Sequence, residues 1–272
     1  MRTIEQLKTG RATFSVGQAF SDGWALVSRH LGYYILGGIV VMVIAFAASL
    51  IPFVGSLANN FILSPCLMAG AVFVTWNISR GLGWADLADM FKGFKFLQPV
   101  LIASVIQSFA YMIIGLLVLM NYLDEIMKLF EMSQGADAFE NTEAIELLLR
   151  QMFDGRFILM SAVALIAFLF ISVIWAFKLH FIVIYELQAW PALEMSRRIA
   201  SDNFLKLIGF FLLMGLIIVI SAIPCGIGLL FSLPLMIGAT YSAFAQITNC
   251  DEPEEINKEM FDFMDKQEPG IS

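Results

Sequence analysis

The chain has 272 residues, of which 59% are hydrophobic and only 14% are charged. Soluble domains carry about a quarter charged residues, so this composition excludes an ordinary soluble protein and indicates a chain that lies mostly in a lipid bilayer. The formal net charge of −7 also argues against a nucleic-acid partner, because proteins that bind nucleic acid present basic surfaces.

Charged residues are absent from four segments, residues 30–79, 96–123, 157–177 and 207–250. A membrane-spanning helix needs about 20 consecutive apolar residues. The two longer segments therefore accommodate two spans each, and the two shorter ones accommodate one each. The sequence predicts an all-α polytopic membrane protein with about six transmembrane helices, which form a single integral membrane domain over residues 1–250.

Ahead of the first span lies an amphipathic segment, residues 14–29, in which Phe20 and Trp24 share one helical face. Such a helix can lie in the headgroup layer, with Trp24 as an interfacial anchor. The first span should cover residues 31–51. The first 30 residues lack the apolar core of a cleavable signal peptide, so we expect the helices themselves to direct insertion.

The second span should cover residues 57–79, and Pro65 should kink it. Proline removes one backbone hydrogen bond of a helix, and its ring clashes with the carbonyl four residues back. A short loop at residues 80–97 should then lead to a third span at residues 99–121.

Residues 122–156 form the one sizeable segment between spans, with eight acidic and three basic residues. We expect two short amphipathic helices there, at residues 122–133 and 142–153. An acidic outer loop of this kind offers a surface for a protein partner.

The fourth span should lose its apolar character at Lys178, although the helical pattern continues to Trp190. A second interfacial amphipathic helix should follow at residues 191–202, with Leu193 and Ile199 turned toward lipid.

The fifth and sixth spans should cover residues 204–223 and 228–248, and Pro234 should kink the sixth span. The acidic segment 251–272 should form a tail outside the bilayer.

The orientation follows from the distribution of lysine and arginine, which are enriched in cytoplasmic loops. With both termini in the cytoplasm, 13 of the 16 basic residues lie inside and the remaining three lie in the outer loop 122–156. We therefore expect a multi-pass protein with a cytoplasmic N-terminus, a cytoplasmic C-terminus and a cytoplasmic acidic tail.

Residues 19–79 and 192–248 resemble each other. An interfacial helix, a span, an Ile-Pro turn and a proline-containing span recur in the same order, so that Pro52 matches Pro224 and the string SPCLMAGA aligns with LPLMIGA. Both copies begin on the same side, which predicts an internal parallel repeat. The alternative is a shared apolar composition of two unrelated hairpins.

The stretch HFIVIYELQAWPALEMSRRIASDNFLKLIGFFLL and the opening FSVGQAFSDGWALVSRHLG support a family comparison. They resemble the membrane domain attached to bacterial glycerophosphodiester phosphodiesterases and the related stand-alone six-helix bacterial membrane proteins of unknown function. The resemblance implies a six-helix fold in the bacterial cytoplasmic (inner) membrane. It does not imply phosphodiesterase activity, which belongs to a separate soluble barrel that no segment here is long enough to form.

Catalytic chemistry has little support in the sequence. The two histidines, His30 and His180, are too few and too far apart in the chain for a metal centre, and no nucleotide-binding, hydrolase or metalloprotease motif occurs. We therefore expect no enzyme, no metal and no cofactor. No charged residue lies near the middle of a span, which disfavours an ion-coupled carrier.

Three polar side chains within spans are Asn60, Gln107 and Gln246, of which Asn60 and Gln107 are costly in lipid unless they have partners. Hydrogen bonds between helices would satisfy them, and contact with a ligand is the alternative. Glycines within the spans indicate close helix packing, at Gly37, Gly38, Gly70, Gly115, Gly209, Gly215 and Gly238.

Four basic residues near span ends are candidates for contact with anionic phospholipid headgroups: Lys178, Arg197, Arg198 and Arg29. For Lys178 the alternative is simple extension of a long side chain toward the interface.

Two functional hypotheses follow. The first is a non-enzymatic membrane module of the bacterial envelope that binds lipid or a protein partner. The second is a transporter of a lipid or an amphipathic solute, with a cavity lined by Asn60, Gln107 and Gln246.

Overall fold

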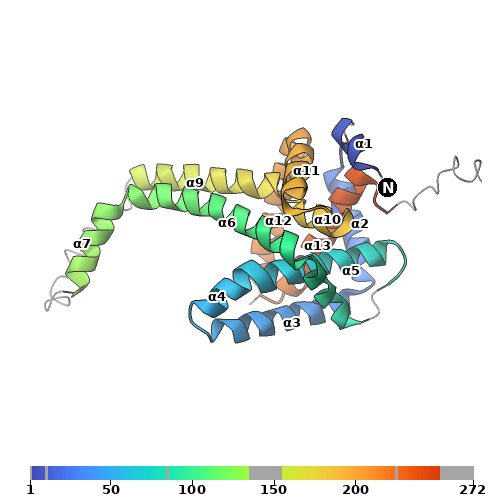
Figure 1. The fold of residues 1–272 in the computed structure, drawn as a ribbon, viewed down its shortest axis with the longest axis horizontal. Coiled ribbons are helices and arrows are strands. Elements are labelled where there is room, and N and C mark those ends of the chain that lie inside the picture. The colour runs from blue at the N-terminus through green and yellow to red at the C-terminus, as the bar shows by residue number, and fades with distance from the viewer. Residues whose placement is uncertain (1, 10–11, 84–85, 135–154, 224–225, 252–272) are drawn as a thin grey trace, which may run out of the picture. The chain divides into compact units, whose positions relative to one another are not determined.

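The computed structural model describes residues 2–9, 12–83, 86–134, 155–223 and 226–251. Within these ranges the regular structure is entirely helical (Figure 1). Six helical stretches are long and apolar enough to cross a membrane, which confirms the predicted all-α class and the number of spans. The six stretches are Leu31–Ser49, Val54–Ser79, Leu87–Met120, Gly155–Ile184, Phe204–Ala222 and Leu229–Thr248.

The helices follow the predicted order with some additions. The first half of the chain contains α1 (Ile4–Thr9), α2 (Val16–Ser28), α3 (Leu31–Ser49), α4 (Val54–Ala58), the π-helical turn η1 (Asn59–Leu63), α5 (Ser64–Ser79) and the 3₁₀ helix η2 (Leu87–Phe96). The rest contains α6 (Leu97–Met120), α7 (Leu123–Gln134), α9 (Gly155–Ile174), α10 (Lys178–Ile184), α11 (Ala189–Asp202), α12 (Phe204–Ala222) and α13 (Leu229–Thr248).

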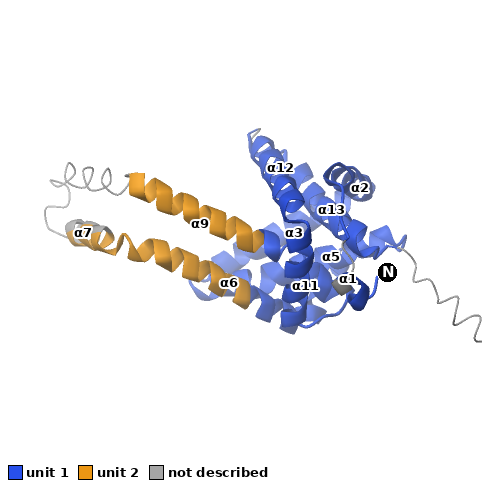
Figure 2. Ribbon diagram, turned by 90° about the horizontal axis from the view of Figure 1, so that it is seen from above, with its two compact units in different colours: residues 1–104, 173–272 blue, residues 105–172 orange. Residues whose placement is uncertain are grey.

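The chain divides into two compact units (Figure 2). Unit 1 comprises residues 1–104 together with 173–272, and unit 2 comprises residues 105–172. Both segments of the predicted repeat, 19–79 and 192–248, therefore belong to unit 1.

Unit 2 is built on the parts of α6 and α9 that it contains, which run side by side (Figure 2). The Tyr111 and Ser172 hydroxyls lie 2.8 Å apart, and Gln107 Nε2 donates a hydrogen bond to the Tyr111 hydroxyl at 2.6 Å. The Tyr111 ring also stacks on Phe168, with ring centroids 4.2 Å apart. Large apolar side chains of both helices are exposed around this junction, as expected for helices surrounded by lipid.

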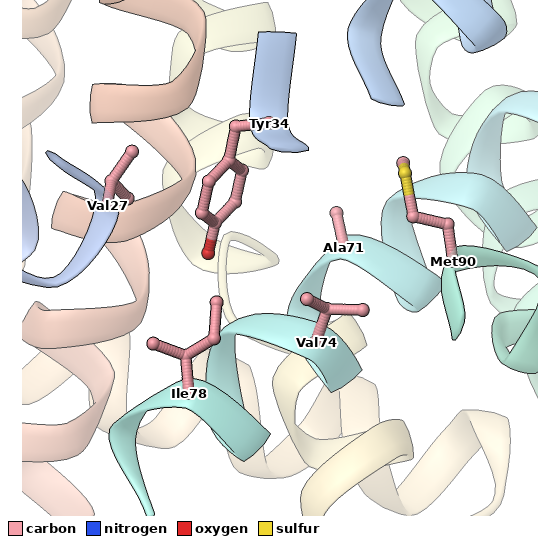
Figure 3. Packing of buried hydrophobic residues seen from close by; sticks show 6 residues of the cluster. All are labelled: Val27, Tyr34, Ala71, Val74, Ile78 and Met90. Atoms are coloured by element: carbon pink, nitrogen blue, oxygen red, sulfur yellow. The ribbon is translucent and has the colours of Figure 1, made fainter. Parts of the chain in front are cut away.

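One buried hydrophobic cluster of unit 1 lies around α5 and combines side chains from α2, α3, α5 and η2 (Figure 3). Tyr34 reaches from α3 to α5, where its hydroxyl lies 2.7 Å from Thr75 Oγ1. Thr75 donates in turn to the Ala71 carbonyl at 2.7 Å, so this buried hydroxyl pair is satisfied. The buried cluster consists of Val27, Tyr34, Ala71, Val74, Ile78 and Met90.

Two close helix contacts in unit 1 depend on glycine. A Cβ atom at Gly238 of α13 would lie 2.6 Å from the Gly23 carbonyl oxygen of α2, and a Cβ atom at Gly70 of α5 would overlap the Met90 backbone of η2. Gly70 and Gly238 occupy matching places in the aligned strings SPCLMAGA and LPLMIGA. This correspondence agrees with the predicted repeat, which remains a prediction.

Four other glycines do not pack closely. A Cβ atom at Gly38, Gly115, Gly209 or Gly215 would meet nothing within 4 Å, so the expectation of tight packing was wrong at these positions. Glycine in an apolar sequence marks where helices can approach, and the partner helix decides where they do.

The two prolines occupy different positions in their helices. Pro65 lies in the first turn of α5, directly after the π-helical turn η1. A π turn shifts the hydrogen-bonding register where proline lacks its N–H group. Pro234 lies inside α13, and the helix continues through it without interruption. The chain is thus helical on both sides of each proline, and the kinks expected at Pro65 and Pro234 remain predictions.

Several predicted boundaries need correction. The helical pattern does not reach Trp190, because α10 ends at Ile184 and Glu186 has a positive φ of 52°. The next helix, α11, begins at Ala189. The loop at residues 80–97 contains η2, which begins with a capping box between Asp86 and Asp89.

Of the two helices predicted in the acidic loop 122–156, the first is confirmed by α7. The second, at residues 142–153, lies outside the described residues, as does the tail beyond Asp251.

Candidate functional site

The beginning of the chain is bound to the end of the last span. The Arg2 backbone N–H donates to the Thr248 carbonyl at 3.0 Å, and the Arg2 guanidinium donates to the Ile247 carbonyl, also at 3.0 Å. The Tyr185 hydroxyl donates to the Arg2 carbonyl at 3.1 Å. Arg2 thus caps carbonyl groups at the C-terminal end of α13, where a positive charge is favourable.

Three further hydrogen bonds hold the segment that leads into α2 to Asn203, which lies between α11 and α12, and to α12 and α13. Asn203 Nδ2 donates to the Ala12 carbonyl at 2.9 Å, and Lys206 Nζ donates to the Phe14 carbonyl at 3.3 Å. The Ser15 backbone N–H donates to Gln246 Oε1 at 2.9 Å. We call the surface formed by residues 2–9, 12–18, 203–206 and 246–251 the terminal face of unit 1.

A cleft of about 770 Å³ opens on the terminal face. Among the described residues that line it, Lys206 is the one charged side chain. The lining residues are Thr13, Phe14, Ser15, Val16, Gln18, Lys206, Gln246 and Asn249. Hydroxyl, amide and ammonium groups thus share the lining with the apolar Phe14 and Val16, and the start of α2 adds the positive end of a helix dipole.

Buried aromatic packing fixes the wall of the cleft. Phe14 is 3% exposed, and its ring lies edge-on to Phe210 of α12 with centroids 6.1 Å apart. Phe20 of α2 packs on the same ring at 5.1 Å. The backbone around Lys206 is therefore held from two elements, which makes the cleft a formed feature of unit 1.

A polar cluster lies where α13 ends. Ser79 Oγ donates to the Asp251 carboxylate at 2.6 Å, and the Tyr241 hydroxyl also donates to Asp251. Burial, together with the nearby Asp251 carboxylate, raises the pKa of the Cys250 thiol to about 11. Cys250 is therefore a protonated thiol at neutral pH and a poor nucleophile.

The buried histidine, His180, lies among aromatic rings. Its ring centroid is 5.0 Å from that of Phe244 and 5.9 Å from that of Phe177. Neither ring nitrogen has a hydrogen-bond partner among the described residues. Anywhere among the described residues, no group of three or more His, Cys, Asp or Glu side chains is placed to hold a metal ion.

The four basic residues predicted to meet headgroups differ in their surroundings. Arg29, Arg197 and Arg198 are exposed, whereas Lys178 is half-buried at the start of α10. Arg197 donates two hydrogen bonds to Glu194, at 2.8 and 2.5 Å. These bonds lower the pKa of the Glu194 carboxyl and raise the pKa of the Arg197 guanidinium.

The prediction that one face of α11 is turned toward lipid was wrong. Leu193 and Ile199 are only 3% and 4% exposed, so they pack inside unit 1. Amphipathic periodicity identifies an apolar face but does not say whether lipid or protein covers it.

The three polar residues predicted within spans are not gathered at the cleft. Asn60 is exposed on η1, and Gln107 is bonded to Tyr111 in unit 2. Of the three, Gln246 alone lines the cleft. Sequence reasoning did not select Lys206, because its contact with Phe14 joins residues 192 positions apart. The one available signal was a lysine in the first turn of a span.

Six apolar helical stretches define the chain as a multi-pass helical membrane protein. Comparison with protein families, with curated proteins and with solved structures finds no match to the chain. The resemblance to the membrane domain of glycerophosphodiester phosphodiesterases therefore stays a prediction based on the quoted residues.

Proposed function

We propose that this membrane protein is a non-enzymatic module of the bacterial inner membrane that binds an anionic phospholipid at its terminal face. The observation that carries the proposal is the cleft with Lys206 as the one charged side chain among its described lining residues. A cation in a cleft of mixed polar and apolar lining beside a membrane suits a phosphate headgroup with its attached lipid.

The chemistry of the cleft suits this ligand. An ammonium group has three N–H donors, and the bond from Lys206 to the Phe14 carbonyl is a long one of 3.3 Å. The amine can therefore bind a phosphate oxygen while it keeps this contact. The side chains of Thr13 and Gln18 are exposed and can donate to further headgroup oxygens.

The distribution of basic residues supports a cytoplasmic position for this face. Anionic lipids of that leaflet attract a basic residue near the surface by about 1 kcal/mol. Cysteine labelling of intact cells tests the orientation: a cysteine placed at Asp137 should react with an impermeant reagent, and one placed at Gln267 should not. The reverse pattern would remove the cytoplasmic leaflet from the proposal.

Lipid binding is tested with Lys206→Gln, and Lys206→Arg keeps the positive charge. We expect Lys206→Gln to weaken binding of phosphatidylglycerol in detergent micelles about fivefold, because about 1 kcal/mol corresponds to that factor. Native mass spectrometry with phosphatidylglycerol and phosphatidylcholine measures the effect and its headgroup dependence.

The matched control is Arg156→Gln, which removes an exposed base in unit 2. Equal loss of phosphatidylglycerol binding in Lys206→Gln and Arg156→Gln would show general charge attraction, and the cleft would then have no special role.

Transport of a lipid or an amphipathic solute is the second candidate. The second span contains the π-helical turn η1 directly before Pro65, and π turns inside helices are frequent at functional sites. Passage of a fluorescent lipid across proteoliposome membranes would favour transport, and its absence alongside Lys206-dependent binding would favour the module.

A further inference from the structure

The last residues of the chain begin next to the cleft. Asn249, which lines the cleft, ends α13 in the left-handed conformation with φ of 51°, and this turns the chain at the rim. Two residues later, Asp251 is bound by Ser79 and Tyr241. The chain that follows therefore starts from a fixed point on the terminal face.

The following residues carry charge of the opposite sign to Lys206. Residues 252–268 contain two basic residues, Lys258 and Lys266, against seven acidic ones: Glu252, Glu254, Glu255, Glu259, Asp262, Asp265 and Glu268. No acidic residue stands among the described residues that line the cleft. Carboxylates of this segment would thus meet an ammonium group that no acidic side chain among the described lining residues contacts.

The reach is short. An extended chain covers about 3.3–3.6 Å per residue, so Glu254 can lie up to about 17 Å from Asn249. Since Asn249 is itself part of the rim, the first three acidic residues after Asp251 are within range of the opening.

We propose that the acidic segment 252–268 docks into the cleft through contact of its carboxylates with Lys206 and thereby competes with anionic lipid. The competition rests on the proposed function, whereas the docking itself does not. A tethered segment acts at an effective concentration in the millimolar range, so weak individual contacts suffice to occupy the cleft. An anionic lipid must then displace the segment, which makes binding depend on the density of such lipid in the leaflet.

Docking is tested without lipid, on the full chain in neutral detergent. A carbodiimide joins an amine to a carboxylate that it contacts, and peptide mass spectrometry locates the link. We expect links from Lys206 to Glu252, Glu254 or Glu255 to exceed by about fivefold those from Lys128, an exposed amine on α7. Lys206→Arg should abolish them, because arginine does not form this link. Links no more abundant at Lys206 than at Lys128 would overturn the docking.

Competition is tested with the double variant Glu254→Lys/Glu255→Lys. Phosphatidylglycerol binding should tighten about fivefold over the unaltered chain, because a surface pair contributes up to about that factor. Adding Lys206→Gln should remove the gain, whereas a gain that persists without Lys206 would overturn competition at this cleft.

The two assays separate the two proposals. Links at Lys206 without any Lys206-dependent lipid binding would support the docking and contradict the proposed lipid binding. Lys206-dependent lipid binding without links at Lys206 would support the proposed lipid binding and contradict the docking.

Discussion

The α2–α13 contact in unit 1 and the α6–α9 pair in unit 2 join helices by different means. At Gly23 and Gly238 the two backbones touch, because neither residue has a side chain to separate them. In the α6–α9 pair, the helices are joined by hydroxyl and amide hydrogen bonds at Tyr111 and by ring stacking on Phe168. Within a bilayer there is no hydrophobic force between helices, so the α6–α9 pair depends on such side-chain hydrogen bonds and packing.

The difference has a consequence for function. A backbone contact tolerates almost no displacement, and it holds the start of α2 at a defined place beside α12 and α13. That start forms the wall of the cleft on the terminal face. The α6–α9 pair instead exposes most of its surface as apolar side chains, which suits a segment whose main neighbour is lipid.

The largest effect on stability is expected from Gly238→Ala, which disrupts the backbone contact between α2 and α13. The new Cβ atom would lie 2.5 Å from Val27 Cγ2 and 2.6 Å from the Gly23 carbonyl oxygen. The helices must separate, and such overpacking lowers the free energy of unfolding by about 3 kcal/mol. Thermal unfolding in detergent measures the loss. Gly209→Ala is the control, since its Cβ atom would meet nothing within 4 Å. Similar stability of the two variants would contradict the contact.

A smaller effect on stability is expected from Tyr111→Phe, which removes a hydrogen-bonding group between α6 and α9. The ring stacking remains, but the hydroxyl that joins Gln107 to Ser172 is lost. Hydrogen bonds between membrane helices contribute about 0.6 kcal/mol on average and about 1.7 kcal/mol at most. A double-mutant cycle with Ser172→Ala isolates the interhelical part. A loss as large as that of Gly238→Ala would mean that the two junctions do not differ as described.

The sequence predicted what depends on neighbouring residues. Stretches without charge identified the six spans, and the amphipathic patterns located α2 and α11 within two residues of their ends. Which partner covers a face was not predictable: Leu193 and Ile199 were expected in lipid and lie inside the protein. The cleft depends on the meeting of Phe14 and Lys206, and no local pattern encodes that meeting.

Contact between distant residues also explains why the sequence did not predict where α10 ends. Apolar and aromatic residues continue to Trp190, so the pattern favours one long helix. The chain instead leaves the helix after Ile184, and Tyr185 then bonds to the Arg2 carbonyl. This contact forms with a residue at the opposite end of the sequence, so it could not be predicted locally.

The smallest effect is expected at the exposed ion pair on α11, where Arg197 and Glu194 are both about half exposed. The pair lowers the pKa of the Glu194 carboxyl below its ordinary value of 4.5. A lowered folded-state pKa means that the contribution is present above 4.5 and is lost as the pH falls through the lower, folded value. Exposed pairs on helices contribute about 0.3–0.5 kcal/mol.

Glu194→Gln should therefore unfold at a slightly lower temperature than the unaltered chain at pH 7, and the difference should shrink as the pH falls below 4.5. Added salt at pH 7 should reduce the difference, because exposed charges are screened. A pH-independent difference would point to packing around α11 as its cause. A difference above about 1 kcal/mol at pH 7 would show that this exposed pair contributes as much as the hydrogen bonds of the α6–α9 pair, and the expected order of the three effects would then be wrong.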